Sequence, residues 1–265
     1  MATELTRPLR IGLQVKPQHA DYSVIRRAAV TAEELGVDIL FNWDHFFPLG
    51  KIREGKHFEC WTMLGAWAEA TSRIMIGPLV TCNGYRNPDL LADMARTVDH
   101  ISGGRLVLGM GAGFREWEFQ KYGYEPGTPG SRLTELAEAL PRIKTRFAAL
   151  NPPPVSTIPM LIGGSGERRT LKLVAEHADI WHTFTEGDEL AHKQRVLARH
   201  CADLGRDPAE IEHSVFIGGD PKQVGPPLRD LGVTLFVPLI GGPDLDFTEV
   251  RSWLAWRDEQ NRAVG

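Results

Sequence analysis

Short apolar runs alternate with helical patterns along the 265 residues, and this alternation limits the possible folds more than any other feature. Apolar runs of this length between helical patterns are typical of buried parallel strands. We count eight runs, each followed by a helical pattern. A doubly wound open sheet usually has about five or six parallel strands, whereas a closed barrel has eight. The sequence therefore predicts an α/β fold of the (β/α)8 TIM-barrel type.

The expected boundaries follow from the periodicity and from helix-capping residues. We expect residues 1–265 to form a single barrel domain, with a long loop at about residues 110–130 after the fourth strand. A loop of that length in a compact domain is more often functional than not. The expected strands cover residues 10–15, 39–41, 74–81, 105–109, 160–162, 179–182, 210–217 and 233–237. The expected helices cover residues 21–36, 59–71, 87–102, 131–150, 167–177, 189–204, 221–231 and 247–260.

Charge and composition narrow the classes of partner. The net charge is -4, and the 30 basic and 34 acidic residues are interspersed, which gives no indication of a nucleic acid or a membrane surface as partner. Residues 1–7 lack the apolar core of a signal peptide, and no run approaches the roughly 18 apolar residues of a membrane span. Cys60, Cys82 and Cys201 lie far apart without metal-site spacing, which indicates free thiols in a reducing cytoplasm.

The second expected strand ends in the polar pair Asp44-His45, which aromatic residues flank on both sides. In a closed barrel the chemistry lies at the carboxyl ends of the strands. Taken alone, the pair is more typical of packing, with Asp44 capping a loop and His45 against the aromatic rings. Other expected strands also end in polar or glycine-rich residues, which favours a catalytic interpretation. Free imidazole titrates near neutral pH, so His45 is the candidate acid or base, and Asp44 would orient it or bond to a cofactor.

Two glycine-rich segments follow expected strands. Gly163-Gly-Ser-Gly166 precedes an expected helix, so its backbone and Ser165 could bind a phosphate at the helix N-terminus, although a plain turn remains the alternative. Gly109-Met-Gly-Ala-Gly113 superficially resembles a dinucleotide motif, but no acidic residue follows at the required distance. We interpret it as a backbone platform against a flat ring.

Metal chemistry and serine hydrolysis are less well supported. Asp44, His45, His182 and His19 could in principle bind a metal, but no His-Glu-x-x-His motif or paired carboxylates accompany them. No nucleophile elbow is present either. The sequence therefore predicts no metal site.

With these motifs the chain resembles the luciferase-like oxidoreductases, in particular the branch that uses the deazaflavin coenzyme F420. The resemblance covers about residues 10–237, and the block from Arg86 to Gly113 is its most specific part. It rests on Asp44-His-Phe-Phe-Pro48, Gly77-Pro-Leu-Val-Thr81, Tyr85-Arg-Asn-Pro88, Ile101-Ser-Gly-Gly-Arg-Leu-Val-Leu-Gly-Met-Gly-Ala-Gly113 and Ile162-Gly-Gly-Ser-Gly166.

The resemblance implies a luciferase-like barrel whose tricyclic cofactor ring lies across the strand carboxyl ends. Asp44 and His45 match the pair that faces cofactor and substrate. In the family a non-proline cis peptide bond often lies behind the ring, and here it would fall near Leu79-Val80. The resemblance also implies a homodimer, for which Trp61, Trp67 and Trp253 are possible contacts, with core packing as the alternative. The cofactor-binding residues that it implies are Asp44, Leu79, Val80, Thr81, Gly111, Ala112, Gly113, Gly163, Gly164, Ser165 and Gly166.

Two departures from the family pattern bear on the substrate. The glucose-6-phosphate dehydrogenases of this family have a Trp where this chain has Leu49, and a Glu where it has Phe114. A more apolar substrate is therefore expected, in a pocket formed by Leu49, Phe114, Trp117 and His182. The expected reaction is hydride transfer between F420 and a small, rather apolar organic molecule. Two alternatives remain open: an FMN-dependent monooxygenase of the same superfamily, and a barrel that binds its cofactor without turnover.

Overall fold

A computed structural model describes residues 7–264. The expected absence of a signal peptide concerned residues 1–7, and nearly all of these lie outside the described residues. The strands are β1 (Arg10–Val15), β2 (Ile39–Asn42), β3 (Met75–Pro78), β4 (Thr81–Cys82), β5 (Leu108–Gly111), β6 (Met160–Gly163), β7 (Ile180–Thr183), β8 (Glu212–Phe216), β9 (Val233–Val237) and β10 (Leu239–Ile240). The helices are α1 (Tyr22–Leu35), α2 (Cys60–Ala70), η1 (Asn83–Tyr85), α3 (Pro88–Ser102), α4 (Glu116–Lys121), α5 (Pro129–Ala149), α6 (Thr170–His177), α7 (Gly187–Leu204), η2 (Pro208–Glu210), α8 (Pro221–Asp230) and α9 (Thr248–Val264).

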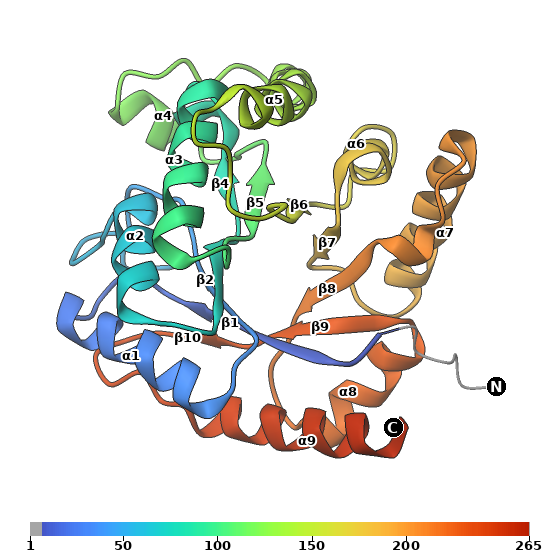
Figure 1. Cartoon of the computed structure of the whole chain (residues 1–265). Coiled ribbons are helices and arrows are strands. Elements are labelled where there is room, and N and C mark those ends of the chain that lie inside the picture. The colour runs from blue at the N-terminus through green and yellow to red at the C-terminus, as the bar shows by residue number, and fades with distance from the viewer. Residues whose placement is uncertain (1–6, 265) are drawn as a thin grey trace.

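The strands form one parallel sheet in the order β3-β2-β1-β9-β8-β7-β6-β5-β4, with β10 beside β1. β3 and β4 are consecutive pieces of one barrel position. β4 pairs with β5, and the Val107 amide donates to the Ile76 carbonyl over 2.8 Å. The sheet therefore closes on itself, and helices surround it (Figure 1). This confirms the predicted TIM barrel; that residues 1–265 form one domain stays a prediction.

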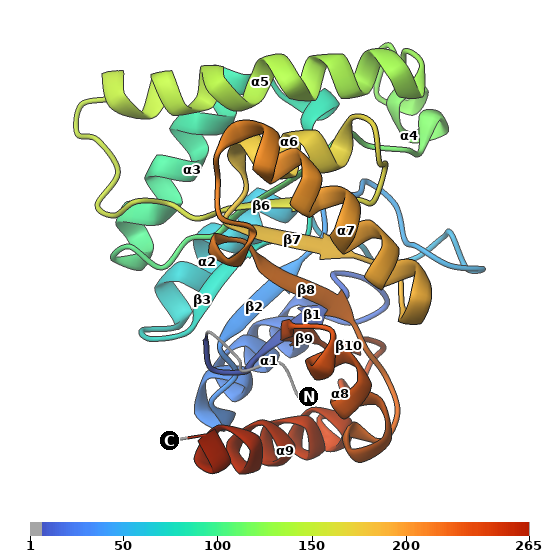
Figure 2. The same ribbon diagram turned by 90° about the vertical axis from the view of Figure 1, so that its right-hand side faces the viewer.

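Side chains alternate between two apolar layers, as parallel strands buried on both faces require. Leu13 and Trp181 belong to the outer layer, between strands and helices. Phe41, Leu161 and Val237 belong to a smaller cluster inside the barrel. The strands β7 and β8 point toward the side of the molecule where α4 lies (Figure 2), so that side carries the carboxyl ends.

Several boundaries differ from the sequence-based expectation. The expected third strand is interrupted at Leu79-Val80, and the fourth begins later and ends at Gly111. The segment expected as a loop at residues 110–130 contains α4. The expected helix start at residue 167 was wrong, because α6 begins at Thr170. Local periodicity could not find these changes, since each depends on pairing with a neighbouring strand or on packing against the barrel mouth.

Helix ends that depend on local chemistry agree with the sequence. The Asn87 side chain accepts a hydrogen bond from the Asp89 amide over 2.9 Å, and Pro88 occupies the first helical position. Gly36 ends α1 with a φ of 82°, in the left-handed region that glycine adopts without strain. Both signals depend only on adjacent residues, so the sequence is sufficient to predict these helix ends.

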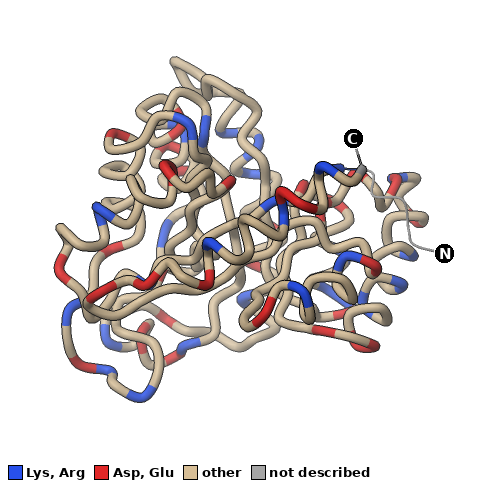
Figure 3. Tube along the Cα trace, turned by 90° about the horizontal axis from the view of Figure 1, so that it is seen from below, with Lys and Arg blue, Asp and Glu red and all other residues tan. Residues whose placement is uncertain are grey.

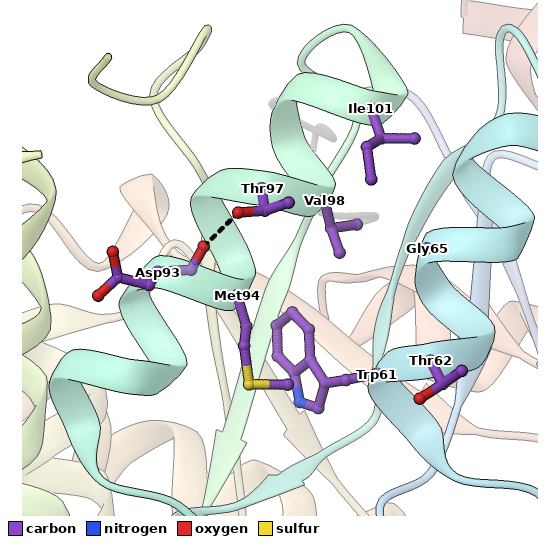
Figure 4. A pocket seen from close by; sticks show the side chains of 8 residues that line it. All are labelled: Trp61, Thr62, Gly65, Asp93, Met94, Thr97, Val98 and Ile101. Carbon is purple, nitrogen blue, oxygen red and sulfur yellow. Dashed lines mark hydrogen bonds between the residues drawn. The ribbon is translucent and has the colours of Figure 1, made fainter. Parts of the chain in front are cut away.

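The outer surface carries both signs of charge. Basic and acidic residues are interspersed along the trace in Figure 3. Among the described helices, none has the length and apolar character that crossing a membrane would require. A groove lies between α2 and α3, outside the barrel, where Trp61 and Met94 project toward one another (Figure 4). Trp61, Trp67 and Trp253 are at most 3% exposed and pack in the outer core.

Candidate active site

Asp44 lies just beyond the carboxyl end of β2 and is 2% exposed. Its carboxylate accepts two hydrogen bonds from Arg86, over 2.5 and 3.1 Å, and others from the Thr81 hydroxyl and the Cys82 amide. Arg86 also pairs with Glu59 over 2.7 Å. Asp44 therefore fixes the end of β4 to the end of β2. In the free protein its carboxylate bonds to these groups and not to His45.

His45 is held by Glu118 of α4. The His45 Nδ1 atom lies 3.0 Å from Glu118 Oε2, and the Tyr85 hydroxyl donates to the same oxygen over 2.9 Å. Arg115 donates to Glu118 Oε1 over 2.7 Å. A carboxylate at Nδ1 favours the tautomer with the proton on that nitrogen, which leaves Nε2 of His45 to act on a ligand.

The Glu118 side chain is fully buried. Burial acts to raise the pKa of Glu118, but the hydrogen bond and charge of His45, the hydrogen bond of Tyr85 and the charge of Arg115 outweigh it, and the net pKa is lowered. Sequence reasoning missed this residue. The available signal was a glutamate with helical spacing inside the glycine-rich, aromatic segment at residues 110–130, where charged residues are ordinarily exposed.

The peptide bond between Leu79 and Val80 is cis, at the position that the resemblance implied. It interrupts the strand and directs the Val80 side chain across a row of glycines. A Cβ atom on Gly111 would lie 2.6 Å from Val80 Cγ2, and one on Gly163 would lie 3.1 Å from Val80 Cγ1. On Gly109 it would lie 2.0 Å from the Pro78 carbonyl oxygen. The glycines thus make room for Val80, which forms a wall inside the barrel mouth.

This contact gives a stability test. We expect Gly111→Ala to lower the free energy of unfolding by about 1–3 kcal/mol, because the new methyl group overlaps Val80. The double variant Gly111→Ala/Val80→Ala should recover part of that loss. Gly65→Ala is the matched control, since a Cβ there meets nothing within 4 Å and alanine favours a helix. Urea denaturation measures all three, and a loss in Gly111→Ala that Val80→Ala does not relieve would contradict the contact.

The second glycine-rich segment lies at the end of β6. Gly164 has a φ of 122°, and its carbonyl accepts a hydrogen bond from the Trp181 indole over 2.7 Å. Ser165 is partly exposed there. Three further residues separate Gly166 from α6, so the segment does not lead straight into the helix as expected. Arg169 extends toward α5, where it donates to the Gly130 carbonyl over 2.7 Å.

Several buried polar atoms at the mouth have no hydrogen-bond partner in residues 7–264. They are both amide atoms of Gln14, the indole nitrogen of Trp43, the Asn83 carbonyl oxygen and Nε2 of His182. Leaving a buried polar atom unpaired costs about 1–3 kcal/mol, so native proteins rarely keep several together. These atoms lie at the carboxyl ends of four different barrel strands, where a ligand could satisfy them, although one buried atom in each of His57, Trp67, Arg96 and Trp253 is also unpaired within the described residues.

The four residues expected in the substrate pocket lie in different surroundings. Phe114 is 69% exposed, and its ring centroid lies 5.6 Å from that of His45. The Trp117 ring packs against Phe47, with ring centroids 4.8 Å apart. Leu49 is held through its backbone, since its amide and carbonyl both bond to the Gln18 side chain. His182 lies on the inner face of β7 beside Phe216, with ring centroids 4.5 Å apart.

Comparison with known proteins identifies the family. The profile of one protein family, described as luciferase-like monooxygenase, matches residues 6–218. The chain belongs to the luciferase-like monooxygenase family. An uncharacterized protein of Mycobacterium tuberculosis is 31% identical over 161 residues, which are 56% of this chain and 57% of that protein. The phthiodiolone/phenolphthiodiolone dimycocerosates ketoreductase of the same species is 28% identical over 215 residues, which are 74% of this chain and 54% of that protein. The alignments thus span little more than half the length of these relatives.

Solved structures of luciferase-like enzymes share the fold. An F420-dependent secondary alcohol dehydrogenase, in complex with an F420-acetone adduct, aligns with a TM-score of 0.81 at 18% identity over 94% of this chain and 98% of that one. The F420-dependent tetrahydromethanopterin reductase of Methanopyrus kandleri aligns with a TM-score of 0.73 at 18% identity, over 94% and 97% of the two chains. The FMN-bound oxygenating constituent of 3,6-diketocamphane monooxygenase from Pseudomonas putida aligns with 0.64 at 17% identity, over 79% and 67%. At such identities the likeness establishes the fold and not the cofactor.

In this luciferase-like barrel the structure brings most of the expected site together. Val80 lies against the glycines of β5 and β6, as the positions of Gly111 and Gly163 show, and Thr81 beside it begins β4. Ala112 lies beside this row but packs against the outer core, and Gly113 packs against Cys82 and Phe119. Asp44 and His45 are neighbours in sequence that bond to different partners. Glu118, and not Asp44, hydrogen-bonds to the His45 ring.

Proposed function

We propose that this chain is an F420-dependent oxidoreductase that transfers a hydride between the deazaflavin and a small, rather apolar organic substrate. The observation that carries the proposal is His45, held at Nδ1 by the buried Glu118, at the same end of the barrel as the wall that Val80 forms over the glycines. The flat ring of the cofactor and the imidazole of His45 would lie at the same end of the barrel, which suits hydride transfer coupled to proton transfer. The unpaired Trp43 and Asn83 atoms supply hydrogen-bonding groups for a polar ring edge.

Each expected cofactor residue has a role in this proposal. Leu79, Val80 and Thr81 would support one face of the ring, and the backbone of Gly111, Ala112 and Gly113 would border it. The segment from Gly163 to Gly166 would receive the phosphate of the tail. When bound, coenzyme F420 supplies the centre that accepts or donates the hydride. The chain itself orients the reactants and excludes water.

His45 would hold or move the proton at its Nε2 atom. Glu118 would fix the ring by accepting a hydrogen bond from Nδ1–H, and it would stabilise the imidazolium if Nε2 took up a proton. Asp44 would have a structural role, since Arg86 neutralises the charge of its carboxylate. The exposed Phe114, next to His45, would contact the apolar part of the substrate.

A parallel titration with F420 and FMN, monitored by tryptophan fluorescence, tests the cofactor. We expect saturable quenching by F420 and much weaker quenching by FMN. Trp43→Phe should remove a large part of the signal because that indole lies at the mouth, whereas Trp253→Phe, buried in the outer core, should not. Tight FMN binding without F420 binding would favour the FMN-dependent monooxygenase instead.

His45→Ala tests the proposed acid or base. Turnover of the F420-loaded protein should fall by about 100-fold or more, since a positioned acid or base contributes about 100- to 10,000-fold. The Kd for F420 should change by less than about threefold. Steady-state kinetics measures the turnover, and fluorescence titration measures the Kd for F420. Unchanged turnover would remove His45 from the mechanism, and tight F420 binding without redox activity on any substrate would favour a barrel that only binds its cofactor.

A cytoplasmic homodimer completes the proposal. The mass in solution, measured by light scattering, tests the oligomeric state. A monomer at micromolar concentration would contradict it.

A further inference from the structure

Gln14 of β1 and His182 of β7 both point into the barrel at its carboxyl end. The residues on either side of Gln14, Leu13 and Val15, belong to the outer core, and Gln14 lies in register with Phe41 of the inner cluster. The His182 ring packs against Phe216, which contacts the same inner cluster. Since strand residues alternate between faces, both side chains face the barrel interior near the carboxyl ends of their strands, and we call this pair the floor of the mouth.

Both side chains carry hydrogen-bonding atoms that nothing in residues 7–264 satisfies. Gln14 is 0% exposed, and neither its amide oxygen nor its amide nitrogen has a partner. His182 is 2% exposed; its Nδ1 lies 2.9 Å from the Ser214 hydroxyl, and its Nε2 has no partner. Two such side chains on one floor provide a preformed site for a polar group of a ligand.

The floor carries no net charge that could receive an ion. Burial lowers the pKa of His182 to about 3, so its imidazole is neutral at physiological pH. The two carboxylates of the mouth already have partners, Asp44 with Arg86 and Glu118 with Arg115 and His45. A carboxylate or phosphate on the floor would lose its hydration without gaining an opposite charge from Gln14 or His182.

We propose that Gln14 and His182 bind the carbonyl or hydroxyl oxygen of an uncharged substrate, an inference that rests on the proposed function. The Gln14 amide has both a donor and an acceptor. It can donate to a ketone oxygen and accept from an alcohol, so one side chain serves both oxidation states of the substrate. Phe184 and Phe216, whose rings lie next to His182, would contact the apolar flank.

The first test needs no ligand. Gln14→Leu keeps the volume of the side chain and removes two unsatisfied polar atoms, so the melting temperature of the ligand-free protein should rise by about 2–4 °C. Asn42→Leu is the matched control. Asn42 is equally buried, but its amide donates to the Cys60 carbonyl over 2.9 Å and accepts from the Cys60 thiol, so that variant should melt at a lower temperature. A lower melting temperature in Gln14→Leu would overturn the proposal.

The second test compares two probes of similar shape, cyclohexanone and cyclohexanecarboxylate, each at millimolar concentration. Cyclohexanone should raise the melting temperature of the F420-loaded wild-type protein, and the carboxylate should not. Gln14→Leu and His182→Phe should lose the response to cyclohexanone. Equal stabilisation by the carboxylate, or none by the ketone, would overturn the proposal.

The affinity for F420 shows whether the oxygen that Gln14 and His182 bind belongs to the substrate or to the cofactor. The Kd for F420 should change by less than about threefold in Gln14→Leu. A rise of tenfold or more, with the cyclohexanone response intact, would assign the floor to the cofactor and overturn the substrate assignment. Failure of wild-type protein to bind F420 would instead contradict the proposed function, while the ligand-free melting test would still stand.

Discussion

Replacing Glu118 with Gln should lower turnover by about 100-fold while the Kd for F420 changes by less than about threefold. The carboxylate accepts hydrogen bonds from His45, Tyr85 and Arg115, and its charge fixes the Nδ1 proton of His45. An amide has one accepting oxygen and no charge, so the His45 ring loses both its orientation and the stabilisation of its protonated form. Steady-state kinetics across pH measures the effect.

Glu118 acts through His45, so the test needs a readout that a purely structural role would not change. The pH profile of kcat should change in Glu118→Gln, because the negative charge next to the proposed acid or base is gone. Glu116→Gln is the matched control in the same helix, since that side chain is 53% exposed and its only ion pair in the described chain spans 3.5 Å. An unaltered pH profile with a lower melting temperature would mean that Glu118 only supports the fold.

Replacing Arg86 with Met should lower the free energy of unfolding by about 3–5 kcal/mol, which is the usual result of removing one partner of a buried ion pair. Asp44 is 2% exposed, and without Arg86 it retains hydrogen bonds only from Thr81 and Cys82. The double variant Asp44→Asn/Arg86→Met should recover a large part of the loss, because no fully buried charge is left unpaired; the other partner of Arg86, Glu59, is 41% exposed. Urea denaturation at neutral pH measures each variant.

A second pair of the same chemistry provides the control. Arg142 also binds an aspartate, Asp89, through two nitrogens, but the side chains are 51% and 41% exposed. Arg142→Met should change the free energy of unfolding by less than about 0.5 kcal/mol, since exposed pairs contribute little. Equal losses in Arg86→Met and Arg142→Met would show that burial of the Asp44 pair has no energetic consequence.

The proposed substrate preference has a local basis in the aromatic residues of the rim. Phe46 stacks on Tyr122 at 3.9 Å and lies 4.3 Å from Tyr85, which extends the apolar surface around His45. Tyr122 belongs to the aromatic segment at residues 110–130, whereas Phe46 and Tyr85 come from other parts of the chain, and the sequence did not predict that they meet. Their stacking depends on α4 folding back over the mouth, which brings residues about 80 positions apart into contact.

The alternation of strands and helices was determined by the sequence alone. Periods of two and about 3.6 residues are local properties, and so are a cap such as Asn87 and a helix stop such as Gly36. They were sufficient to predict the barrel and to locate His45 at a strand carboxyl end. The resemblance to a known family also located the cis bond at Leu79-Val80. Each of these features depends on neighbouring residues or on a short motif.

The contacts that define the site were decided only by the tertiary structure. Glu118 reaches His45 across 73 positions of the chain, and nothing near either residue specifies the other. The glycines that suggested a backbone platform leave room for Val80. Gln14, which no motif singled out, lies buried with both amide atoms unpaired. Hydrogen-bond satisfaction and close packing are properties of the closed barrel. They become defined only when distant strand ends meet at one mouth.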